Sequence, residues 1–414
     1  MPPTERWRTN LYAIAAAQFI ALAGGNLVFP FMPFYVEELG VTDPDRIALW
    51  SGLLGTATGS MLFVFSPIWG SLADRFGRKP LLLRAYLGAL VTMTLQGLVQ
   101  NVWQLAALRA LQGVFVGTIP AATALVAAGT PRDRIAYALG LVQMALFSSQ
   151  FVGPLIGGLL ANSIGFRTTF LVAGPFYLIS FLLVLLVVEE RFERPAVHER
   201  ASFVANLRLV FERRALMVII GVIFFLNAGP SFVRPIIPLF VESFDTGASP
   251  EAISGIAFAA LSFTSAAAAL ASSRISARAG YRNALALATV GAGAAYLPVA
   301  IAGNAPALIV LIAVVGLFSG GMVPTANALV DRLAPPGRQA SAFGLAGSAT
   351  ALAFAVAPLS GGVVASSLGL HAGFLVIGAL TIVVGLAIPT LLHEPGRDEP
   401  GVAEGAEAMG EPGG

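Results

Sequence analysis

Two arginines, Arg109 and Arg234, lie inside long apolar stretches of this sequence and are the side chains there best suited to chemistry. An arginine within a membrane helix costs about 2.5–3.5 kcal/mol on insertion scales. A chain keeps such a charge where it faces a cavity and has a partner. For Arg109 a second interpretation stays open. It stands only a few residues into its stretch, so its side chain could extend to the polar interface.

Carboxylates that change protonation could move protons, but no Asp or Glu lies at the centre of an apolar stretch. The candidates stand at the ends of the stretches: Glu37, Glu38, Glu242, Asp74 and Asp331. We expect Glu37 or Glu242 to titrate and to neutralise Arg234, because both occupy equivalent positions of an internal repeat. The alternative is that these glutamates anchor helix ends at the membrane surface.

Other reactive groups are sparse in the sequence. There is no Cys, which excludes disulfides and thiolate metal sites, and the three His residues are far apart. The only lysine, Lys79, follows Arg78, so the Gly-Lys of a phosphate-binding loop is missing. A membrane enzyme or receptor would call for a cluster of His, Asp and Glu or a sizeable soluble domain. We therefore expect neither an enzyme nor a bound cofactor or metal.

The composition indicates that lipid surrounds most of the chain. Of its 414 residues, 57% are hydrophobic and 11% charged, with a mean hydropathy of +0.81; soluble domains carry about 25% charged residues. A membrane helix needs about 20 apolar residues. The sequence predicts an all-α integral membrane protein with twelve such segments, roughly at 11–36, 47–71, 80–100, 103–128, 135–162, 167–188, 215–241, 251–273, 283–302, 305–330, 338–367 and 371–392.

The segments divide the chain into two six-helix bundles. We expect an N-terminal bundle at 1–188, a cytoplasmic linker at 189–214, a C-terminal bundle at 215–392 and a disordered cytoplasmic tail at 393–414. Most of the 24 Lys and Arg residues then fall on one side, and the opposite side carries only Arg46 and Arg167. Because cytoplasmic loops are rich in Lys and Arg, both termini are predicted to be cytoplasmic, in the cell (inner) membrane.

An internal repeat relates the two halves at an offset of about 204–205. Pro30, Pro33 and Glu37 match Pro235, Pro238 and Glu242, and two further blocks match around Pro120 and Pro154. Because each repeat holds an even number of helices, the halves run in parallel about an axis along the membrane normal. This arrangement predicts a site between the halves near the midplane, exposed to each side in turn as one half rocks against the other.

Four sequence motifs resemble those of a known family. The first is the loop Gly70–Pro80, Gly-Ser-Leu-Ala-Asp-Arg-Phe-Gly-Arg-Lys-Pro, and the second is Leu105, Arg109, Gln112 and Gly113. The others are Gly153, Pro154, Gly157 and Gly158, and then Gly24 with Pro30 and Pro33. Together they resemble the major facilitator superfamily, and within it the twelve-helix drug:proton antiporters of bacterial multidrug efflux.

The resemblance implies roles for these residues. Gly70, Asp74, Arg75, Gly77 and Arg78 would latch the halves together on the cytoplasmic side when the protein faces out. An ordinary basic loop is the alternative. Arg109 would take part in proton coupling, for which Asp74 is a further candidate. The antiporter motif at 153–158 would bend and pack its helix, or serve simple glycine packing. The second copy of the loop is degenerate, with Ala277 where the acid would stand.

The resemblance also implies a cavity lined mainly by the first, fourth, seventh and tenth helices, with contributions from the fifth and eleventh. The polar and aromatic candidates are Asn26, Phe29, Gln112, Phe115, Gln143, Phe147, Gln150, Asn227, Ser231, Arg234 and Asn327. Such a mixture suits amphipathic molecules of varied shape. For each residue the alternative is helix–helix packing or contact with lipid.

These inferences predict a secondary active transporter that exports amphipathic or hydrophobic drugs in exchange for protons by rocker-switch alternating access, with a role in antibiotic resistance. The proton is the expected coupling ion, nucleic acid is not an expected partner, and a monomer is expected from the resemblance. The alternative is a metabolite or sugar transporter of the same fold that works as an importer or uniporter. A fixed anionic substrate would favour more cavity cations than Arg109 and Arg234 alone.

Overall fold

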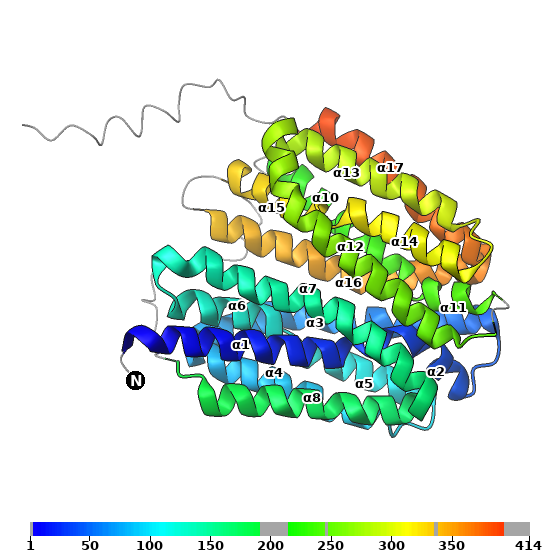
Figure 1. Ribbon diagram of the computed structural model, residues 1–414, viewed down its shortest axis with the longest axis horizontal. Coiled ribbons are helices and arrows are strands. Elements are labelled where there is room, and N and C mark those ends of the chain that lie inside the picture. Colours follow the sequence, from blue (N-terminus) through cyan, green and yellow to red (C-terminus); the bar gives the residue numbers. More distant parts are fainter. Residues whose placement is uncertain (1–2, 191–213, 245–246, 335–337, 393–414) are drawn as a thin grey trace, which may run out of the picture.

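The computed structural model describes residues 3–190, 214–244, 247–334 and 338–392, and the elements observed there are helices (Figure 1). In the first half they are α1 (Pro3–Asn26), η1 (Phe29–Phe31), α2 (Met32–Glu38), α3 (Pro44–Phe76), α4 (Arg78–Gln96), α5 (Val102–Phe115), α6 (Thr118–Gly129), η2 (Arg132–Arg134), α7 (Ile135–Ile164) and α8 (Phe166–Val187). In the second half they are α10 (Arg214–Val233), α11 (Ile236–Glu242), α12 (Pro250–Ala279), α13 (Tyr281–Val299), α14 (Ala305–Ser319), α15 (Met322–Leu333), α16 (Gln339–Leu368) and α17 (Leu370–Leu391).

Prolines and glycines break four of the spans into two helices each. Pro30 lies between α1 and α2, and Pro235 lies between α10 and α11, since proline lacks the N–H that continues a helix. Pro33 and Pro238 stand in the first turn of α2 and of α11. Gly117, at φ 140°, separates α5 from α6, and Gly320 and Gly321 lie between α14 and α15. When each broken pair is counted as one, the described helices form twelve spans, as predicted.

Ten of these spans are long and apolar enough to cross a membrane by length and composition, within the described residues. The other two are α4 and α13, with 19 residues each. At a rise of about 1.5 Å per residue, each is about 28 Å long, close to the hydrocarbon thickness of about 30 Å. The all-α membrane fold predicted from the sequence is therefore confirmed.

The two halves repeat the same helix caps and glycine turns. Asn101 caps α5 by accepting from the Gln104 N–H at 3.0 Å, and Asn304 caps α14 by accepting from the Ala307 N–H at 2.9 Å. Gly165 and Gly369, at φ 81° and 88°, each turn the chain between two long helices. These matched positions show that the repeat extends to individual caps and turns.

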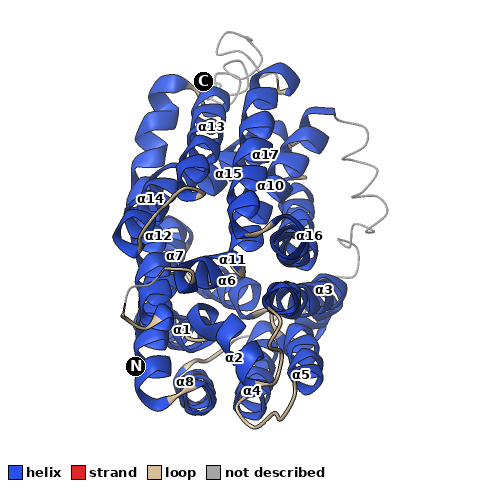
Figure 2. Ribbon diagram, turned by 90° about the vertical axis from the view of Figure 1, so that its right-hand side faces the viewer, coloured by secondary structure: helices blue, strands red, loops and turns tan. Residues whose placement is uncertain are grey.

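The halves form two bundles, which Figures 1 and 2 show one above the other. They meet mainly where α3 packs on α16 and α7 packs on α12. Close approach there depends on small residues: a Cβ at Gly52 or Gly55 would meet Pro358, and one at Gly255 would meet the Pro154 carbonyl. Small residues of this kind let helix backbones come close in a membrane.

This contact is confined to one end of the bundles. The glycines in contact lie toward the loop between α2 and α3, which we call the closed side. Toward the end where α1 begins, which we call the basic side, a Cβ at Gly70, Gly140, Gly344 or Gly347 would meet nothing within 4 Å. Figure 1 shows α7 and α12 close together on the closed side and apart toward the basic side, so the bundles separate there.

The predicted linker and tail lie largely outside the described residues, which omit 191–213 and 393–414. The start of the linker is described and packs on the first bundle. The Glu190 carboxylate accepts from the backbone N–H groups of Arg78 and Lys79, both at 2.8 Å, which caps α4. Its neighbour Glu189 pairs with Arg6.

Candidate functional site

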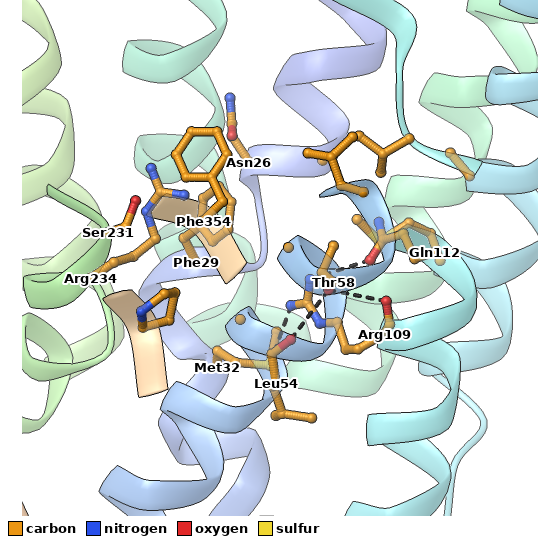
Figure 3. Close-up of a pocket in the computed structure, with 18 of the residues that line it drawn as sticks. Asn26, Phe29, Met32, Leu54, Thr58, Arg109, Gln112, Ser231, Arg234 and Phe354 are labelled. Carbon is orange, nitrogen blue, oxygen red and sulfur yellow. Dashed lines mark hydrogen bonds between the residues drawn. The ribbon is translucent and has the colours of Figure 1, made fainter. Parts of the chain in front are cut away.

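A cavity of about 290 Å³ lies between the bundles (Figure 3). The first bundle contributes the break between α1 and α2 and the middle of α3, α4, α5 and α8, and the second contributes the break between α10 and α11 and part of α16. Five sequence candidates line it together: Asn26, Phe29, Gln112, Ser231 and Arg234. The breaks matter here, because a broken helix turns side chains of one span inward at mid-depth.

Arg109 enters the cavity from α5 and is 7% exposed. Its Nη1 donates to Gln112 Oε1 at 3.3 Å and its Nη2 approaches Met32 Sδ at 3.4 Å. Its Nε is buried and has no hydrogen-bond partner among the described residues. The alternative that Arg109 extends to the membrane surface is therefore wrong, because the side chain points into the protein.

Arg234 enters from the opposite wall, at the break between α10 and α11 (Figure 3). Its guanidinium lies over the Phe29 ring, 4.2 Å from the centroid, and this contact joins the two bundles. Arg234 also lies within electrostatic range of Arg109. Two cations from different bundles thus face one cavity.

The predicted partners of Arg234 lie elsewhere. Glu37 and Glu242 are exposed on the closed side, and neither forms an ion pair with Arg234 in the described structure. The expectation that one of them neutralises Arg234 is therefore wrong: each follows its proline break by a full helical turn or more and ends outside the cavity. Instead, Glu242 lies within electrostatic range of Glu37 and Glu251.

Six further candidates do not line this cavity. Phe115 packs against Gly88, and the Asn227 Nδ2 donates to the Ile223 carbonyl at 2.8 Å. Gln143 is exposed, and the remaining three are Phe147, Gln150 and Asn327, which are partly exposed. The rotation of each helix about its axis decides which of its faces meets the cavity. Because these helices are apolar on all faces, the sequence does not indicate that rotation.

Several lining residues were not predicted, among them Met32, Thr58 and Tyr177. Thr58 Oγ1 donates to the Arg109 carbonyl at 3.0 Å, and thus ties α3 to α5 beside the arginine. Thr58 stands between Gly55 and Gly59, and this stripe of small residues was the available signal of a close helix crossing.

The antiporter motif packs α7 against both bundles. A Cβ at Gly153 would meet Asn26 and Ala23, and one at Gly157 would meet the backbone of Leu27, both in the first span. On the next face, a Cβ at Gly158 would meet the backbone of Glu251 in α12, and Pro154 approaches Gly255. The motif therefore supports the α1 break and the contact between bundles at once.

The loop predicted to be a latch lies on the basic side, where the bundles are apart. Gly77, at φ 97°, turns the chain between α3 and α4. Arg75 is exposed and stacks on the Phe76 ring at 5.4 Å, and the Arg78 N–H is held by Glu190. Gly70 faces open space, and the Asp74 side chain is not among those described. In this state the loop packs on its own bundle.

Comparisons with known proteins agree with this architecture. The model of the family described as "Major Facilitator Superfamily" matches residues 14–304 and 228–411. The multi-drug resistance efflux pump PmrA of Streptococcus pneumoniae is 31% identical over 369 residues, covering 89% of this chain and 92% of the relative. The chain belongs to the major facilitator superfamily.

Two more similarities refine this placement in the major facilitator superfamily. The multidrug resistance protein MdtG of Serratia proteamaculans is 38% identical over 247 residues, which span 58% of this chain and 59% of that relative. The inward-facing, unoccupied structure of a bacterial homologue of the human lysosomal transporter Spinster has a TM-score of 0.75 at 14% identity, covering 94% and 99% of the two chains. That likeness concerns the fold. The chain is thus a multi-pass membrane transporter of small molecules and not an enzyme.

Proposed function

We propose that this transporter exports amphipathic or hydrophobic small molecules in exchange for protons by rocker-switch alternating access. The observation that carries the proposal is one mid-depth cavity, built from both bundles, with the bundles in contact on one side of it and apart on the other. The names of PmrA and MdtG as multidrug resistance proteins support export of such compounds. With the basic side in the cytoplasm, this structure corresponds to the inward-facing state.

The walls of the cavity suit compounds of this kind. Phe29, Phe354 and Leu54 provide apolar surface, and Asn26 and Gln112 provide amide groups. An apolar pocket with a few polar groups binds organic molecules through burial of their surface and orients them through hydrogen bonds. In the proposed cycle a compound enters from the basic side, and rocking of the bundles exposes it on the closed side.

The test is reconstitution in liposomes with an imposed pH gradient. The probes are N-phenyl-1-naphthylamine, ethidium and 8-anilinonaphthalene-1-sulfonate, which are neutral, cationic and anionic, with a pH-sensitive dye to report proton movement. We expect transport of at least one probe to depend on the gradient and to be matched by proton movement in the opposite direction. Gradient-independent uptake of sugars or other metabolites, with no movement of the probes, would overturn the proposal and favour an importer or uniporter.

Proton coupling has a candidate in three carboxylates on the closed side, where Glu242 lies within electrostatic range of Glu37 and Glu251. Glu37 comes from the first bundle, and Glu242 and Glu251 come from the second. When all three are ionised, their repulsion opposes contact of the bundles, and protonation removes it. Acid outside would then favour closure of this side, which is the step that returns an exporter to the inward-facing state.

Substitution of both predicted carboxylates tests this idea. We expect Glu37→Gln with Glu242→Gln to flatten the dependence of transport on external pH by about 3- to 10-fold, because neutral amides no longer repel. The matched control is Glu38→Gln, which removes a neighbouring carboxylate that pairs with Arg167 at 2.9 Å. Transport rates are measured at fixed internal pH over a range of external pH. An unchanged proton-driven profile in the double variant would rule out both glutamates.

A further inference from the structure

The cavity between the bundles carries two positive charges and no compensating acid. Arg109 and Arg234 both line it, and no Asp or Glu occurs among the described residues of its wall. A guanidinium stays protonated in proteins, so burial does not neutralise it. The described ion pairs of the chain, such as Arg167 with Glu38, all lie outside this cavity.

The hydrogen-bonding capacity of Arg109 is only partly used. Its contacts are an amide oxygen at 3.3 Å and a thioether sulfur at 3.4 Å, both neutral acceptors at long range. Its buried Nε has no partner among the described residues. A guanidinium presents a planar fork of donors that matches the oxygens of a carboxylate or phosphonate. The site thus offers donors that its own side chains do not satisfy.

Arg234 is held toward the same space by an aromatic ring. The Phe29 face fixes the guanidinium at 4.2 Å while leaving its N–H groups without a carboxylate among the described residues. Arg234 and Arg109 repel each other, since they lie within electrostatic range. An anion between them would relieve this repulsion, whereas a cation would add to it.

The rest of the wall sets the shape of such an anion. Phe354, Leu54, Leu62 and Met93 are apolar, and the volume of about 290 Å³ far exceeds that of an inorganic ion. The cavity therefore suits a compound with an apolar body and one charged end. Because one arginine belongs to each bundle, such a compound would also attract the bundles toward each other and so bias the equilibrium between states.

We propose that the transported compound is an amphipathic organic anion, whose carboxylate, sulfonate or phosphonate group binds between Arg109 of α5 and Arg234 at the α10–α11 break. This inference rests on the proposed transport function for its role as a substrate site. It reverses the expectation from the sequence that two arginines are too few for an anionic substrate, because both arginines face one cavity.

The test uses a matched pair of probes on the purified full-length protein. 8-Anilinonaphthalene-1-sulfonate and N-phenyl-1-naphthylamine share one aromatic body and differ by the sulfonate. Affinity is measured in detergent by tryptophan quenching, at low salt and with added chloride, and transport is measured in liposomes. We expect the sulfonate to bind at least about 10-fold more tightly than the neutral analogue, as charge-assisted hydrogen bonds do, and ethidium to bind more weakly than either.

Variants then assign the difference to the two arginines. Arg109→Gln and Arg234→Gln should each weaken sulfonate binding by about 10- to 100-fold and leave the neutral analogue within about 3-fold. Arg109→Lys and Arg234→Lys should recover only part of the binding, since the charge remains but the planar fork of donors is lost. The control is Arg167→Gln, whose side chain is exposed and outside the cavity.

The outcomes separate this inference from the proposed function. Equal loss of both probes in the Gln variants, or unchanged sulfonate binding in them, would overturn the anion site even if pH-driven export persisted. Binding of chloride in place of the sulfonate, seen as loss of sulfonate affinity in chloride buffer with no sulfonate transport, would also overturn it. Selective loss of sulfonate binding without any pH-driven transport would support the site and refute the proton-exchange function.

Discussion

A disulfide between Thr56→Cys in α3 and Leu359→Cys in α16 is expected to stop transport, to about 1% of the reduced rate, because a carrier held in one of its two states completes no cycle. The Thr56 Oγ1 accepts from the Leu359 N–H at 3.1 Å, across the contact between the bundles. Both positions lie on the closed side, where Gly55 and Gly59 bring the helices together. The cross-link therefore fastens the contact that must open in the proposed cycle.

The chain suits this experiment because it contains no cysteine, so only the introduced thiols react. Transport is measured in liposomes after oxidation and again after reduction, with each single variant as a reference. The matched control is Gly70→Cys with Gly347→Cys on the same two helices, where both positions face open space on the basic side. We expect this control pair to form little disulfide in the state described.

Two results would contradict the expectation. Full transport by the cross-linked protein would mean that the closed side does not open during the cycle. Efficient cross-linking of the control pair in the absence of substrate would mean that the basic side closes readily, so that the described state is not the resting one. Recovery of transport on reduction is needed in either case to show that the effect is not damage to the protein.

The sequence predicts most of the fold because lipid simplifies the problem. Apolar stretches of about 20 residues admit one backbone solution, the helix, so segment ends follow from charges, prolines and glycines. Pro30 with Pro235 and Gly165 with Gly369 mark the repeat, and in the structure they break or turn the chain at the matched points. The twelve spans and the parallel halves could therefore be predicted from the sequence alone.

The site was predicted less well, because the uniform apolarity that identifies membrane helices does not show which face lines the cavity. Where all faces of a helix are apolar, the pattern does not show which one turns inward, so Gln143 and Asn227 were as plausible as Asn26 and Ser231. The pairing of Arg109 with Arg234 was hidden as well. The two residues lie in different bundles, and only the assembled contact of α3 with α16 and α7 with α12 brings them to one cavity.

The conformational state was beyond the sequence altogether. The latch residues Gly70, Arg75 and Gly77 have the same identities whether the loop spans the bundles or packs on its own half. Here Glu190, at the start of the linker, holds the N-terminus of α4 beside this loop. The role of the loop in bridging the bundles stays a prediction, and its Asp74 side chain lies outside what the structure describes.

A single added carbon at Gly157 is expected to destabilise the protein by about 1–3 kcal/mol, the usual cost of overpacking a core. In Gly157→Ala the new Cβ would meet the carbonyl, carbonyl carbon and Cα of Leu27. Backbone atoms cannot rotate away as a side chain can, so α7 and the first span must separate. Thermal unfolding in detergent measures the loss, and Gly140→Ala in the same helix, with nothing within 4 Å, is the control.

The repeat supplies a second copy of the same test and connects it to the site. Gly361 of α16 approaches the backbone of Phe232, as Gly157 approaches that of Leu27. Phe232 lies two residues before Arg234, and Leu27 lies two residues before Phe29; both Arg234 and Phe29 line the cavity. Gly361→Ala should therefore also lower stability and, by displacing Arg234 from the Phe29 face, weaken binding of the sulfonate probe about 10-fold. The control here is Gly347→Ala. Unchanged stability and binding after either substitution would contradict this explanation. The close approaches of Gly157 and Gly361 would then not be what holds Phe29 and Arg234 at the cavity.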